Sequence, residues 1–418
     1  MFSLNKGFLF QCALLSTLAL SSVTQAKVWT SEQTWNEEWE NKYSTWIQNE
    51  FNDDVFMKGA FAGIPTDCAD AVYAARVIFS AQNKLPFLIS GGASNSTSRF
   101  DNISDPTKRL RAFIQYVGDD TSTQSLPNDT YPVAINAQGL KPGIIWLRSS
   151  YASENFFVRL FAGPNAPSGH TEVVKNISPS GIIYLMGSTV PSKVRNLLTV
   201  TSLAFLPDNN KLGFRRWIWP QNRNMQPSLM ANYSLEQFSM GVPTQTNNNN
   251  CTDCGASSGN TRKSIQEFTA QIQARLALQA ETKPEYFERM AKDLCSMIQL
   301  RHEVVQDAVK YNKKAGQCMS ADAYENFSTP SRDKRIKDWL KQMLDANGNG
   351  LFSSASKRLE KLSSYFSTCA DLKLQSGENL KIADALTAFA KGNVSSNPND
   401  SELARWGLDN SKTSCSGK

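Results

Sequence analysis

One cysteine lies where a thiol could act as a nucleophile. Cys68 follows Asp67 after the turn signal Gly63-Ile64-Pro65, and apolar residues at helical spacing come after it. Asp67 and Asp70 form a helix-capping pair, which predicts Cys68 in the first turn of a helix. Unpaired backbone N–H groups and the helix dipole favour the thiolate there. A buried structural cysteine is the alternative interpretation.

The start of the chain predicts export. Lys6, an apolar run and the small-residue exit Thr24-Gln25-Ala26 form the pattern of a secretory signal peptide, residues 1–26, cleaved after Ala26. We therefore expect a periplasmic or secreted protein, in an oxidising compartment. No later segment has a long apolar run, so no transmembrane segment is expected after cleavage.

The number of cysteines distinguishes Cys68 from the others. Seven of the eight cysteines remain after signal cleavage, and an odd number leaves one thiol unpaired. Cys68 is the predicted free thiol because the other six cluster in the second half of the sequence. These six are Cys251, Cys254, Cys295, Cys318, Cys369 and Cys415.

Net charge limits the classes of partner. The charge of +6 falls to +5 on signal cleavage because the leader contains one lysine. The basic residues are dispersed rather than gathered in a stripe, so the sequence gives no case for nucleic-acid binding. A mild positive excess is compatible with an anionic surface such as the cell wall.

Hydrophobic patterning predicts an α+β domain at residues 27–242. The spacing of Trp35, Trp39, Tyr43 and Trp46 predicts one buried face of a helix. A hairpin-like connection at 176–181 makes the last two predicted strands antiparallel neighbours. The predicted strands are 143–147, 155–161, 170–174 and 181–186.

A linker at 243–263 and a helical domain at 264–418 complete the predicted organisation. The linker is rich in Asn, Gly and Ser, and cysteines distributed among the later helices would staple them together with disulfides. The predicted helices are 263–280, 284–314, 332–344, 356–365 and 382–391.

His170 is the candidate base for Cys68. The chain contains two histidines. His302 lies within a predicted helix, where a surface histidine is the default. His170 follows Pro167-Ser168-Gly169 and begins a predicted strand, so it is the imidazole suited to activate a nucleophilic thiol.

Short motifs around these residues resemble those of papain-like cysteine hydrolases. Cys68 at a helix start, Pro142-Gly143 before a strand and Gly169-His170 at the start of the next strand are most similar to the CHAP amidases and NlpC-type cell-wall peptidases, with transglutaminase-like proteases as cousins. The resemblance covers about residues 60–190. It implies a papain-like helix and small antiparallel sheet, and an exported hydrolase that cleaves amide bonds in peptidoglycan peptides through a Cys68 thioester, without cofactor or metal.

The sequence departs from this family at two positions. Ile144 stands where the family has the aspartate of a Pro-Gly-Asp motif. The strand after His170 ends in Ser188 and Thr189, where the family carries Asp, Glu, Asn or Gln to orient the histidine. Ser188 is the candidate third catalytic residue, with Thr189 and Asn222 as alternatives.

Glu172 is a further acidic neighbour of His170. It lies on the same face of the predicted strand, but about 7 Å along it, which we take as a poor distance for orienting the imidazole. The third catalytic residue is therefore unassigned. The competing interpretation is a catalytically degenerate papain-like protein that binds or scaffolds components of the cell envelope.

Two other motifs predict ordinary structure. Cys251 and Cys254 have the spacing of a redox or metal motif but lie in the linker, so a structural disulfide is preferred. Residues 345–350 resemble half of a calcium loop, but Ser356 replaces the glutamate at position twelve, so a plain turn is preferred.

Overall fold

The computed structural model describes residues 27–148, 169–201, 206–207, 209–240, 259–315, 318–348, 355–409, 413 and 415. Four sequence predictions lie outside these residues: the signal peptide 1–26, the strand 155–161, the Cys251–Cys254 pair and most of the linker 243–263. The calcium-like segment 345–350 is described as far as Gly348.

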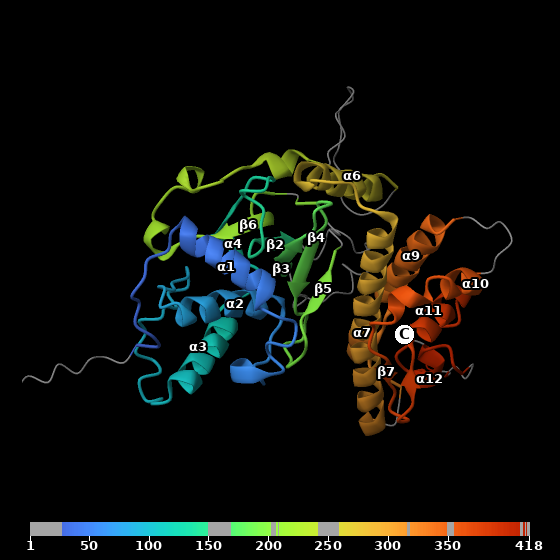
Figure 1. Cartoon of the computed structure of the whole chain (residues 1–418). Helices are drawn as coiled ribbons and strands as arrows, with labels where there is room; N and C mark the ends of the chain where they lie inside the picture. Colours follow the sequence, from blue (N-terminus) through green and yellow to red (C-terminus); the bar gives the residue numbers. More distant parts are fainter. Residues whose placement is uncertain are drawn as a thin grey trace, which may run out of the picture.

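In the first part of the chain four helices precede the six strands β1 to β6, and a mainly helical part follows (Figure 1). The first part contains α1 (Glu37–Asn49), α2 (Cys68–Gln82), α3 (Pro106–Asp120), α4 (Leu126–Asp129), β1 (Thr130–Pro132), β2 (Ile145–Arg148), β3 (His170–Ile177), β4 (Ile183–Gly187), β5 (Leu198–Val200) and β6 (Gly213–Trp217). The second contains α6 (Gly259–Leu276), α7 (Lys283–Ala315), α8 (Ala321–Phe327), α9 (Pro330–Ala346), α10 (Ala355–Glu360), β7 (Leu372–Lys373), β8 (Asn379–Leu380), α11 (Ile382–Lys391) and α12 (Glu402–Arg405).

Short 3-10 turns fill several connections. They are Gly59–Phe61, Pro220–Asn222, Pro227–Leu229, Glu236–Ser239 and Ser363–Phe366.

The six strands β1 to β6, as described, form one antiparallel sheet in the order β1-β6-β2-β3-β4-β5. Alternate residues of a strand point to opposite faces of the sheet. Leu147 and Val173 point to the face covered by α1, α2 and α3, where they join the first hydrophobic core. Trp146 points to the other face and packs on Phe268 of α6, with ring centroids 6.1 Å apart. The sheet is therefore covered by helices on both faces.

The second hydrophobic core belongs to the helices from α7 onward. Figure 1 shows α7 between the sheet and the remaining C-terminal helices, and residues of α7, α9 and α11 share one cluster with Trp406. Disulfides join Cys295 to Cys369 and Cys318 to Cys415. The prediction of disulfides in the helical part is confirmed by these two pairs, which also fit an oxidising compartment.

The structure supports the α+β class and adds detail that the sequence did not indicate. Helix α6 begins inside the predicted linker, and Phe268 and Ile272 place it against the sheet rather than in the second core. Strands β1, β5 and β6 were not predicted, since they are short and β6 carries Arg215 and Arg216. No helix of the described chain has the length and apolar composition that a membrane crossing requires.

Candidate functional site

Helix α2 begins at Cys68, and a capping box fixes this start. Oδ1 of Asp67 accepts the backbone N–H groups of Ala69 and Asp70 at 2.9 and 3.0 Å, and Oδ2 of Asp70 accepts the N–H of Asp67 at 2.8 Å. These bonds satisfy backbone donors that a helix start leaves unpaired. The predicted position of Cys68 in the first helical turn is confirmed, and both aspartates act as caps.

Cys68 is a free cysteine and is 4% exposed. Burial, followed by the negative charge of Asp67, raises the pKa of its thiol to about 12. Backbone hydrogen bonds from Thr171 and Ala69 lower the pKa, but by less. The expectation that the helix start favours a thiolate is therefore wrong for this structure, because removing the anion from water costs more than the two N–H groups return. The resting thiol is protonated at neutral pH.

His170 opens β3 and is paired with Glu172. Nε2 of His170 lies 3.2 Å from Oε1 of Glu172, and Nε of Arg148 lies 3.9 Å from the other carboxylate oxygen. Burial raises the pKa of Glu172, but the charge and hydrogen bond of His170 and the charges of Arg148 and Arg335 outweigh it and lower the pKa to about 2. The carboxylate is therefore ionised at neutral pH.

The ionised carboxylate determines which histidine nitrogen carries the proton. A carboxylate can only accept, so Nε2 of His170 donates to Glu172 and Nδ1 of the neutral ring keeps its lone pair. The prediction that Glu172 lies too far along the strand to orient the imidazole is wrong. The separation of about 7 Å applies to the backbone positions of the two residues. Their side chains approach each other and come within hydrogen-bond distance.

Ser188 has a different partner from the one expected. Its hydroxyl donates to the backbone carbonyl of Thr66 at 2.8 Å, and the side chain is buried. This bond ties the end of β4 to the chain just before α2. Glu172, and not the predicted Ser188, is the residue whose side chain contacts the imidazole of His170.

The sheet register separates Cys68 from the imidazole. Thr171 pairs with Leu147 and therefore faces α2, whereas Glu172 pairs with Trp146 and faces the opposite side. His170 shares the face of Glu172 because the two residues are two positions apart. Within the part of the chain that the structure describes, no hydrogen bond joins Cys68 to His170. The structure brings both residues to the same end of β3 but on different faces.

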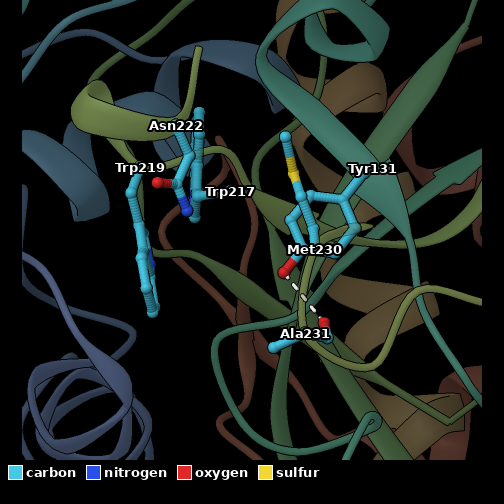
Figure 2. A pocket seen from close by; sticks show the side chains of 6 residues that line it. All are labelled: Tyr131, Trp217, Trp219, Asn222, Met230 and Ala231. Carbon is cyan, nitrogen blue, oxygen red and sulfur yellow. Dashed lines mark hydrogen bonds between the residues drawn. The ribbon is translucent and has the colours of Figure 1, made fainter. Parts of the chain in front are cut away.

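Asn222, the other alternative for the third residue, lies elsewhere. It lines a small pocket at the edge of the sheet formed by β1 and β6. Figure 2 shows Trp217, Trp219 and Asn222 on one side of it and Met230, Ala231 and Tyr131 on the other, with the Tyr131 hydroxyl donating to the carbonyl of Ala231 at 3.0 Å.

Comparisons with protein-family models, with curated proteins and with solved structures gave no match. Among the described residues, no group of three or more His, Cys, Asp or Glu side chains is arranged to hold a metal ion. The chemistry of the site is therefore inferred from its own residues.

Proposed function

We propose that this chain is an exported cysteine hydrolase that cleaves amide bonds, with Cys68 as the nucleophile and His170 as the base. The observation that carries the proposal is the backbone hydrogen bond of Thr171 to the Cys68 thiol. Thr171 directly follows His170, so the free thiol lies against the strand end that carries the imidazole. The resemblance to CHAP and NlpC-type enzymes favours peptidoglycan peptides as the substrate class.

The residues give each proton a route. His170 Nδ1 accepts the Cys68 proton, and the sulfur forms a bond to the amide carbonyl carbon. The backbone N–H of Cys68 at the helix start helps to bind the resulting oxyanion. The protonated imidazole gives its proton to the nitrogen as the C–N bond breaks. His170 then takes a proton from water as the water oxygen attacks the thioester carbonyl. The C–S bond breaks, the acid is released, and the imidazolium returns its proton to the sulfur.

Glu172 has the part of the third residue in this mechanism. Its carboxylate fixes the Nε2–H form of His170 and stabilises the imidazolium that forms when Nδ1 takes the proton. Arg148 and Arg335 keep the carboxylate ionised. Because His170 and Cys68 lie on different faces of the sheet, this mechanism requires the start of β3 to turn until Nδ1 comes within about 3.2 Å of the sulfur.

A specific observation favours a second function, that of a papain-like binding or scaffold protein of the cell envelope. Cys68 is buried with a raised pKa, and His170 faces the other side of the sheet. If the start of β3 does not turn, the thiol cannot transfer its proton to the imidazole.

The two functions are separated by a covalent probe and a substrate. Mature wild-type protein is incubated with a peptidyl chloromethyl ketone and with purified peptidoglycan, followed by peptide mass spectrometry and by detection of new amino groups. A hydrolase gives an adduct on Cys68 and new amino groups, and Cys68→Ala gives neither. His170→Ala removes cleavage, whereas His302→Ala, the matched control in α7, keeps it. A wild-type protein that gives no adduct until it is unfolded, and no cleavage, supports the scaffold function.

A further inference from the structure

The segment from Ser188 to Arg195, here called the 188–195 strap, lies against the start of α2. The backbone N–H of Thr66 donates to the carbonyl of Lys193 at 3.0 Å, and the N–H of Lys193 donates back to Thr66 at 3.3 Å. This isolated antiparallel bridge lies two residues before Cys68. The strap thus holds the backbone that leads into the nucleophile.

Two side chains of the strap add to this attachment. Ser188 donates to the carbonyl of Thr66 at 2.8 Å. Ser192 donates to Oδ2 of Asp70 at 3.1 Å, the same oxygen that caps α2. The strap therefore contacts the chain on both sides of Cys68.

The strap is also attached to α7 of the helical part. Arg195 is 6% exposed, and its guanidinium donates to Glu303 at 3.0 Å and to the carbonyl of Pro191 within the strap at 2.6 Å. Lys193 forms an ion pair with Asp307, one helical turn further along α7. Lys193 thus bonds Thr66 through its backbone and α7 through its side chain.

We propose that α7 positions the nucleophile through the 188–195 strap, with Glu303 and Asp307 as positioning residues. The inference rests on the proposed hydrolase function and gives the helical part a role in it. Two ion pairs restrain the strap from one side, and the bridge to Thr66 passes that restraint to the turn before Cys68. Loosening the ion pairs leaves α2 intact but widens the range of positions that Thr66 and the thiol occupy.

The test removes the two carboxylates of α7 while keeping their shape. The Glu303→Gln/Asp307→Asn variant is compared with wild type by amide hydrogen exchange of Thr66 and Lys193, by iodoacetamide labelling of Cys68 and by kcat and KM. Exchange of both amides should accelerate about threefold or more, as expected for the loss of two partly exposed ion pairs. We expect kcat to fall, KM to stay and the melting temperature to change little.

Two further variants control the interpretation. Asp338→Asn on α9 removes a carboxylate from the exposed Lys334–Asp338 pair and should leave the exchange of Thr66 unchanged. The charge exchange Arg195→Glu/Glu303→Arg re-forms the ion pair with its charges reversed. The Thr66 amide should therefore exchange more slowly in this double variant than in Glu303→Arg alone. A purely local packing defect would not show this recovery.

The outcomes distinguish a failure of this inference from a failure of the proposed function. Unchanged exchange of Thr66 in the Glu303→Gln/Asp307→Asn variant overturns the positioning role, whatever the activity. Accelerated exchange with lowered kcat supports it. If the wild type itself hydrolyses nothing, the hydrolase function fails, and accelerated exchange then supports the mechanical coupling alone.

Discussion

Nε2 of His170 lies 3.2 Å from Oε1 of Glu172, two positions further along β3. In the proposed mechanism, this contact supplies the carboxylate that orients the imidazole. The charge of Arg335 on α9, after the larger effects of His170 and Arg148, also lowers the pKa of this carboxylate. The electrostatics of Glu172 therefore involve both parts of the chain.

Replacing Glu172 should change the acid stability of the protein. Its pKa in the folded state is about 2, below the usual value of 4.5, so its stabilising contribution is present above pH 4.5 and is lost as the pH falls towards 2. At neutral pH this contribution is up to roughly 3 kcal/mol. Between pH 2 and 7, the free energy of unfolding of Glu172→Gln, measured with urea, should depend less on pH than that of wild type. Glu38→Gln, at an exposed ion pair of α1 that solvent screens, should change the slope far less.

The thiol of Cys68 should react slowly in the resting protein. Because burial raises the pKa of this thiol to about 12, the rate of iodoacetamide labelling of the folded protein should keep rising well above pH 9. In urea the same thiol should titrate near the ordinary value of about 8.5. The rates are measured by peptide mass spectrometry. An apparent pKa below 8.5 in the folded state would instead indicate a preformed thiolate and contradict the burial argument.

Ser188→Ala should lower stability and, by loosening the 188–195 strap, lower kcat only modestly. The change removes one of the two hydrogen bonds to the carbonyl of Thr66, which still accepts the N–H of Lys193, and this costs about 1 kcal/mol. Chemical denaturation gives this value. If Ser188 were the residue that orients His170, kcat would fall by orders of magnitude with stability unchanged. Ser364→Ala, in a distant 3-10 turn, serves as a serine control.

Removing the Cys295–Cys369 disulfide should destabilise the helical part. The bridge spans 74 residues, and a cross-link of that length is expected to contribute about 4 kcal/mol by limiting the unfolded chain. Unfolding of Cys295→Ala/Cys369→Ala is followed by the fluorescence of the protein and by hydrogen exchange of α7. A midpoint equal to that of wild type would show that packing of α7 alone holds this part together.

Local signals in the sequence predicted much of the fold. The start of α2 was predictable because Asp67 and Asp70 cap the helix from within three residues. Helical periodicity indicated α1, α7 and α9, and the hairpin of β3 and β4 followed from the short connection between them. The parity of the cysteines singled out Cys68, which is the free cysteine of the described chain.

The sequence by itself determined the candidate residues Cys68 and His170 and the elements that carry them. The tertiary structure decided the protonation of the thiol and the contacts of both residues. The raised pKa of Cys68, the pairing of His170 with Glu172 and the attachment of the 188–195 strap to α7 all depend on groups distant in the sequence. Periodicity and capping act over a few residues, whereas burial and charge act through space, so only the packed chain sets them.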